Sequence, residues 1–103
     1  MSRLPKRRTG QTLRMVQALY GSGIIVIHDW GLQGYVADML RDVRGAEFAK
    51  QWKIVKVQNR SDITKLMGGR TPIVVDHWVW EHIDEATARE LRMVVGSTNA
   101  MAT

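Results

Sequence analysis

The stretch Ile24-Ile25-Val26-Ile27 places four apolar, β-branched residues in a row. Residues of this kind in so short a run favour a β-strand. Because the run has no polar position, both faces of the strand need a cover, as in the central strands of parallel sheets. A second run, Ile73-Val74-Val75, has the same character. The first run therefore predicts a central strand of a parallel sheet, and the second run predicts another strand.

Segments with helical periodicity surround these strands. In each segment the apolar residues recur every three or four positions, and a glycine, which ends helices easily, follows. We also expect Ser61 and Asp84 to cap the third and fourth of these helices. The predicted helices span residues 12–20, 32–43, 61–67 and 84–95, and Gly21, Gly45, Gly68 and Gly96 close them.

A third strand is predicted at residues 52–57, where Trp52, Ile54 and Val57 interleave with two lysines. Such a half-exposed strand is typical of a sheet edge. The segment Trp78-Val79-Trp80 is compatible with an extension of the preceding strand or with a loop.

The resulting alternation of helices and strands predicts right-handed crossovers and a small three-layer α/β/α sandwich with a short, mainly parallel sheet. We expect a single α/β domain at residues 12–96. A basic arm or loop at residues 1–11 would precede it, and a flexible tail at residues 97–103 would follow.

Charge is concentrated at one end of this chain of 103 residues. The net charge of +5 equals the number of basic residues in positions 1–14, and the later basic and acidic residues balance. A basic arm on a neutral body favours an anionic partner, either a nucleotide or a nucleic acid phosphate. The five basic residues of positions 1–14 are Arg3, Lys6, Arg7, Arg8 and Arg14.

Other classes of protein fit the composition poorly. The chain has no cysteine, so disulfides and thiolate metal sites are excluded. Its apolar runs are too short to span a bilayer, and no apolar segment follows the basic N-terminus as in a secretory signal. We therefore expect a cytoplasmic protein without a membrane partner.

Polar pairs follow both apolar strands, at the edge where parallel sheets bind ligands. His28-Asp29 follows the first strand and Asp76-His77 the second. If the strands are neighbours, two carboxylates and two imidazoles meet there and could form a metal or acid–base site. Alternatively, Asp29 caps the next helix and the histidines pack beside Trp30 and Trp78.

A second candidate is the segment Pro5-Lys6-Arg7-Arg8-Thr9-Gly10-Gln11-Thr12, which leads into the first predicted helix. Amides at a helix N-terminus attract phosphate, and a glycine lets the backbone approach it closely. We therefore expect a phosphate-binding loop. Its contributors would be Arg7, Arg8, Thr9, Gly10, Gln11, Thr12 and Arg14.

Gly10-Gln11-Thr12 resembles the end of the Walker A motif of P-loop NTPases, G-x-x-x-x-G-K-[ST], and residues 72–77 resemble a Walker B strand. The likeness covers residues 5–95 and implies half of a P-loop NTPase core. It implies that Thr12 and Asp76 hold Mg²⁺ beside ATP and that His77 contacts the attacking water, so that Asp76 and His77 are the catalytic residues. The sequence of residues 9–14 also resembles a segment of small bacteriophage-encoded P-loop-like proteins. This resemblance implies that the protein is located in the cytoplasm of a host cell.

The sequence departs from that motif at two positions. Pro5 stands in place of the first glycine, and Gln11 stands in place of the lysine that contacts the β- and γ-phosphates. We expect a degenerate P-loop-like domain that binds a nucleotide or another phosphate ligand with weak or no hydrolysis. Residual ATPase activity would require Arg7 or Arg8 to replace the lysine.

Two alternative functions follow from other features. Arg3, Lys6, Arg7 and Arg8 could bind nucleic acid phosphates, with bases stacked on tryptophans. An exposed tryptophan patch could instead bind a protein partner, and the free sheet edge could form a homodimer, although its lysines oppose edge pairing. The tryptophans are Trp30, Trp52, Trp78 and Trp80.

Overall fold

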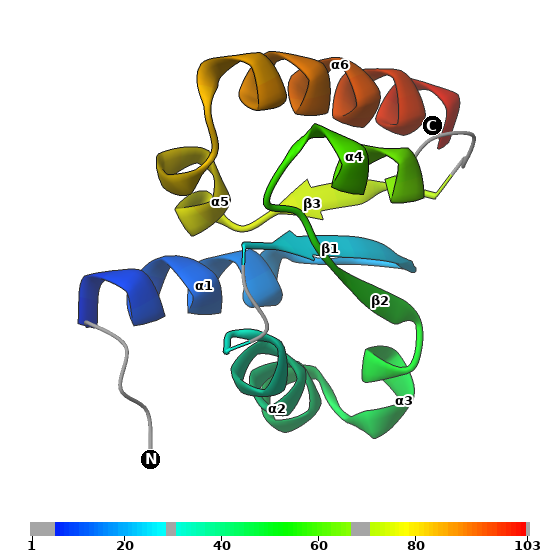
Figure 1. Ribbon diagram of the computed structural model, residues 1–103. Coiled ribbons are helices and arrows are strands. Elements are labelled where there is room, and N and C mark those ends of the chain that lie inside the picture. Colours follow the sequence, from blue (N-terminus) through cyan, green and yellow to red (C-terminus); the bar gives the residue numbers. More distant parts are fainter. Residues whose placement is uncertain (1–5, 29–30, 67–70, 103) are drawn as a thin grey trace.

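Three parallel strands form the centre of the domain in the computed structural model (Figure 1). The structure describes residues 6–28, 31–66 and 71–102, with side chains over 12–28, 31–66 and 71–97. The strands are β1 (Gly23–Ile27), β2 (Trp52–Lys56) and β3 (Ile73–Val75), in the order β2-β1-β3. Both apolar runs are therefore neighbours. Strand β1 is central and β2 lies at an edge, as predicted, and β3 forms the other edge.

Alternating side chains of the sheet divide the core in two. Ile25 and Ile27 of β1 belong to one buried cluster, whereas Val26 belongs to the other. On β3, Val74 packs against the first cluster and Ile73 lies within the second. This period of two is why the central strand needs apolar residues at every position.

Helices α1 (Lys6–Ala18), α2 (Gln33–Arg44) and α3 (Ala46–Ala49) cover the first face (Figure 1). Val16 of α1 and Val36 of α2 are fully buried there. Arg44 joins the two helices, because its Nη1 donates to the carbonyl oxygens of Val16 and Leu19 at 2.9 and 2.6 Å. Gly45, at φ 94°, ends α2 as predicted.

The opposite face packs against α4 (Arg60–Ile63), the 3₁₀ helix η1 (Thr64–Leu66) and α6 (Glu85–Ala102). Ile63, Leu66 and Leu91 fill this second cluster. The short helix α5 (His77–His82) follows β3 and contacts both α1 and β1. Helices thus lie on both faces of a parallel sheet, which confirms the three-layer α/β/α class.

Three predicted boundaries are wrong. Residues 6–11 are the start of α1 rather than an arm, since lysine, arginine and glutamine are good helix formers. Residues 97–102 continue α6 rather than form a tail, and Gly96 lies inside that helix. Residues 78–80 belong to α5, neither a strand nor a loop. Residues 1–5, 103 and Gly68 lie outside the described residues.

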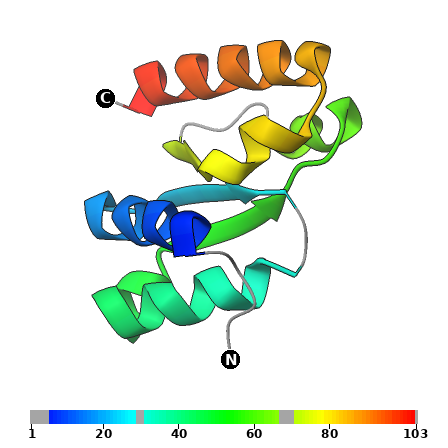
Figure 2. The ribbon, with the colours of Figure 1, turned by 90° about the vertical axis from the view of Figure 1, so that its left-hand side faces the viewer.

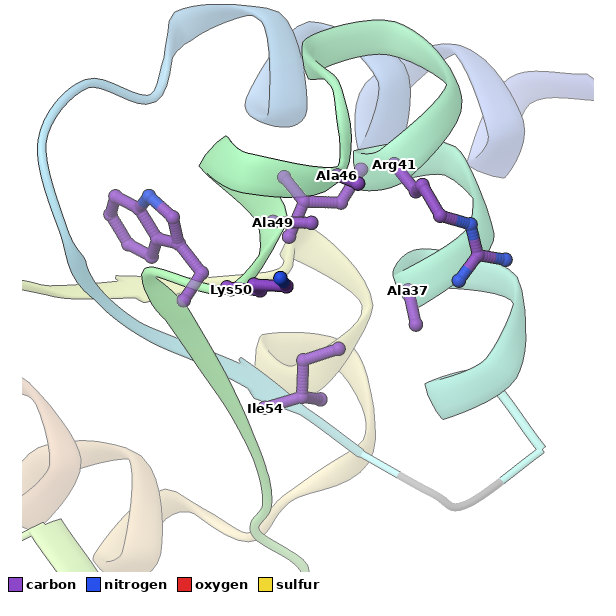
Figure 3. Close-up of a pocket in the computed structure, with 8 residues that line it drawn as sticks. Ala37, Arg41, Ala46, Ala49, Lys50 and Ile54 are labelled. Atoms are coloured by element: carbon purple, nitrogen blue, oxygen red, sulfur yellow. The ribbon is translucent and has the colours of Figure 1, made fainter.

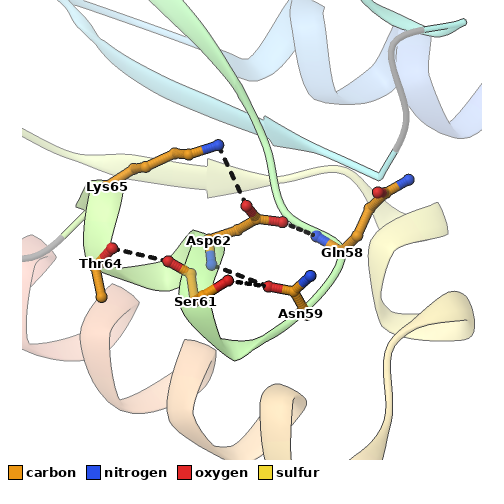
Figure 4. Close-up of polar contacts among 6 residues, drawn as sticks. All are labelled: Gln58, Asn59, Ser61, Asp62, Thr64 and Lys65. Atoms are coloured by element: carbon orange, nitrogen blue, oxygen red, sulfur yellow. Dashed lines mark hydrogen bonds and ion pairs between the residues drawn. The ribbon is translucent and has the colours of Figure 1, made fainter.

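The predicted caps have different outcomes. Asp84 precedes α6, and its Oδ1 accepts a hydrogen bond from the Thr87 N–H at 3.0 Å. Asn59, not Ser61, caps α4: its side-chain oxygen accepts from the Asp62 N–H at 3.2 Å (Figure 4). Asn59 takes this role because its backbone is extended, with φ −150° and ψ 178°, whereas Ser61 is already helical.

Asp62 makes the start of α4 sensitive to pH (Figure 4). Burial raises the pKa of this carboxyl, but the Gln58 N–H, at 2.9 Å, and the Lys65 ammonium, at 3.2 Å, together hold it below 3.8. A carboxyl with a lowered folded pKa contributes stability above its unfolded pKa and loses it as the pH falls through the folded pKa.

We therefore expect Asp62→Asn to flatten the dependence of the unfolding free energy on pH below 3.8. Urea denaturation from pH 6 to pH 3 measures that slope. Lys65→Met, which removes the ammonium and keeps the backbone donors, should give an intermediate slope. A wild-type slope in Asp62→Asn would contradict the assignment.

Candidate functional site

Asp76 lies at the carboxyl edge of the sheet, directly after β3. Its N–H donates to the Val26 carbonyl oxygen at 2.9 Å, which continues the pairing of β3 with β1 by one residue. Its backbone stays extended, with φ −62° and ψ 138°. By the alternation of the strand, the side chain of Asp76 falls on the same face as Val74, toward α1.

Thr12 of α1 meets this carboxylate. The Thr12 hydroxyl donates a hydrogen bond to Asp76 Oδ1 at 3.0 Å across a separation of 64 residues. Both residues are buried, with exposed fractions of 1% for Thr12 and 2% for Asp76. The structure therefore joins the two residues for which the sequence predicts a shared role.

Three aromatic rings form a second cluster at the carboxyl edge. His28 directly follows β1, and its ring centroid lies 4.9 Å from that of His82 in α5. His82 also packs against Trp78, with 4.3 Å between centroids. His82 is exposed, whereas the other two rings are half-buried. We call His28, Trp78 and His82 the ring cluster.

The predicted meeting of His28 with His77 is wrong. The Nε2 atom of His77 lies 2.8 Å from the Glu81 carboxylate, one turn along α5. The imidazole that contacts His28 is His82 instead. Because residues 77–82 are helical, Trp78 and His82 share a face, and a helical reading of that segment would have paired them. Asp29 and Trp30 lie outside the described residues.

The predicted phosphate-binding loop is also corrected. Residues 6–12 form the first two turns of α1, so no loop separates the basic segment from the helix. The first turn projects beyond the carboxyl ends of the strands, where α1 lies beside α5 (Figures 1 and 2). Lys6, Arg7 and Arg8 are thus on the side of the sheet expected for a ligand, and Arg14 is exposed further along α1.

The tryptophans in the described part of the chain do not form the predicted common patch. Trp52 is 7% exposed, and its Nε1 donates to the Gly21 carbonyl oxygen at 3.0 Å, which makes it a core residue. Trp78 packs on the α1 side of the sheet and Trp80 on the opposite side, where the Arg92 guanidinium covers its ring. Their division between two faces weakens the tryptophan-based alternatives, while binding of nucleic acid by the basic residues stays a prediction.

Metal binding has limited support from the donor groups. Within the described ranges, no three His, Asp or Glu side chains gather as a metal site would require. Thr12 and Asp76 supply one hydroxyl and one carboxylate, which are oxygen ligands of the type that Mg²⁺ takes alongside waters and substrate phosphates.

A pocket of about 290 Å³ lies elsewhere, between α2, α3 and the edge strand β2 (Figure 3). Its apolar lining includes Leu40, Trp52 and Ile54. Arg41 and Lys50 stand at its rim, and each forms an exposed ion pair within its own segment, with Asp38 and Glu47. Since neither Thr12 nor Asp76 lines it, this pocket is separate from the candidate site.

Comparisons of this chain with family models, curated proteins and solved structures gave no match. No helix in the described part of the chain is both long and apolar enough to cross a membrane.

Proposed function

We propose that this chain binds a nucleotide or another phosphate-bearing ligand at the carboxyl edge of its sheet, with weak or no hydrolysis. The hydrogen bond between the Thr12 hydroxyl and the Asp76 carboxylate carries this proposal. It brings a hydroxyl from the second turn of α1 together with an acid at the end of a strand.

The free-energy cost of burying the Thr12–Asp76 pair supports a functional role for it. A buried carboxylate loses its hydration, and apolar side chains at both positions would stabilise a core equally well. An exposed ligand would use these oxygens only after some opening of the contact. Because α1 projects past the strands, such a ligand would lie beside the basic first turn, where helix amides and arginines both favour an anion.

Mg²⁺ fits the oxygen atoms of Thr12 and Asp76 as part of the same proposal. When bound, the ion would neutralise phosphate charge. Thr12 would orient it from the helix, and Asp76 would hold it from the strand.

Weak or absent hydrolysis follows from the groups around the pair. Gln11 has an uncharged side chain at the position of the motif lysine, so one cation for the β- and γ-phosphates is missing. His77 is the predicted contact of the attacking water, but its Nε2 faces Glu81. We therefore place Asp76 in the binding of the ligand and leave catalysis to be tested.

The experiment is a titration of the purified chain with Mg-ATP, followed by thermal unfolding and by isothermal calorimetry. We expect a higher Tm, because a ligand that binds only the folded state stabilises it by about 2.7 kcal/mol at a concentration of 100 Kd. Phosphate release in the same samples measures hydrolysis.

Matched variants test the location of binding. Thr12→Val removes the hydroxyl while keeping the shape, and it should abolish the shift, whereas Thr12→Ser should retain it. Thr64→Val is the control, since the Thr64 hydroxyl bonds only locally, to the Ser61 carbonyl oxygen of α4 (Figure 4). No shift of the wild-type Tm at millimolar nucleotide would refute the proposal.

A further inference from the structure

We propose that the ring cluster binds the base of the ligand, so that the site selects a nucleotide over a bare polyphosphate. This inference rests on the proposed function, which by itself leaves the class of phosphate ligand open. The carrying observation is an exposed imidazole, His82, held by two neighbouring rings at the edge where Asp76 lies.

Placement of the ring cluster supports this assignment. Trp78 and Asp76 are two residues apart, and Trp78 packs on the α1 side of the sheet, where Thr12 meets Asp76. His28 follows β1, the strand that pairs with β3. Helix α5 also contacts α1 (Figure 2). The ring cluster and the Thr12–Asp76 pair therefore lie at one edge of the sheet, and Trp78 shares the α1 face with that pair.

The orientation of His82 is determined by its own helix. Its Nδ1 lies 3.1 Å from the Trp78 carbonyl oxygen, which can only accept a hydrogen bond. A hydrogen bond between these two atoms requires the proton on Nδ1, and the neutral ring then offers Nε2 as an acceptor. Such a ring offers an apolar surface for stacking and an acceptor for a base N–H.

Pre-organisation makes the ring cluster suited to this task. The packing of His82 on Trp78 and His28 restricts its rotamers before any ligand arrives, so binding costs little side-chain entropy. Stacking of a base on an aromatic side chain is sequence-tolerant and contributes at least about fivefold in affinity. A purine or pyrimidine is therefore the expected ring.

The test compares Mg-ATP with Mg-tripolyphosphate, which has three linked phosphates but neither ribose nor base, by calorimetry on the full chain. We expect ATP to bind about tenfold more tightly in the wild type. His82→Ala should lower the ATP affinity to that of tripolyphosphate and leave tripolyphosphate binding unchanged. His82→Phe, which keeps an aromatic ring, should restore most of the preference.

Arg89→Ala on α6 serves as the surface control and should keep the wild-type preference, since Arg89 is exposed on the helix that covers the opposite face. Equal wild-type affinities for the two ligands would overturn the inference while leaving the proposed function intact. A preference that survives in His82→Ala would also overturn it. Binding of neither ligand would reject both.

Discussion

Replacing Gly23 with alanine is expected to lower the free energy of unfolding by about 1–3 kcal/mol. A Cβ atom on Gly23 would lie 2.6 Å from the Pro72 carbonyl oxygen and 2.6 Å from the Trp52 ring. The Pro72 oxygen cannot withdraw easily, because it accepts the Ile24 N–H at 2.9 Å between β1 and β3. The Trp52 ring is held by its hydrogen bond to Gly21.

Gly34→Ala is the matched control. Gly34 lies in α2, and an added Cβ there would have no atom within 4 Å apart from its own helix. The same substitution should stabilise this position by about 0.5–1 kcal/mol, because alanine loses less backbone entropy than glycine in a helix. Urea denaturation measures both variants. Equal effects at the two positions would show that the close packing at the start of β1 does not limit the residue there.

Thr12→Val should destabilise the protein by about 3 kcal/mol, because it leaves the buried Asp76 carboxylate without this donor. Thr12→Ser keeps the hydroxyl and should cost less than the valine variant. Thermal and urea unfolding without ligand give these values.

A double-mutant cycle separates the contact from the rest of the environment. Asp76→Leu removes the carboxylate, and adding Thr12→Val to it removes a hydroxyl that no longer has this acceptor. We expect the combined loss to be smaller than the sum of the single losses by at least about 1 kcal/mol. Additive losses would mean that the hydrogen bond contributes no coupling energy. The contact would then be no evidence for the proposed function.

The pair also explains why stability and function need separate measurements here. A buried hydroxyl–carboxylate contact stabilises only relative to its broken form, and an apolar replacement of both partners can be nearly neutral. A double variant that folds but no longer binds Mg-ATP would therefore assign the pair to the ligand rather than to the core. This outcome would strengthen the proposal made from the geometry.

Much of the candidate site could be predicted, but not its contacts. Asp76 was a candidate because acids after buried parallel strands lie at the ligand edge. Thr12 became one through its place beside the basic segment. His82 was missed because the sequence of residues 77–82 does not by itself indicate a helix. Only the helical spacing of four residues brings the His82 ring onto Trp78.

The sequence by itself determined which segments form strands and which strand is central. The apolar run Ile24–Ile27 takes the covered centre and the alternating lysines of residues 52–57 take an edge, whereas the shorter apolar run Ile73–Val75 forms the other edge. The first two positions follow from the residues alone, because folding removes apolar side chains from water and leaves charged side chains exposed.

Only the tertiary structure decided where helices begin and end and which distant groups meet. Lys6 begins α1 and Gly96 lies within α6, because weak local preferences yield to the surrounding helix. The contact of Thr12 with Asp76 spans 64 residues, and it exists because two helices and the sheet bring α1 across the end of β3. No periodicity in the chain encodes that distance.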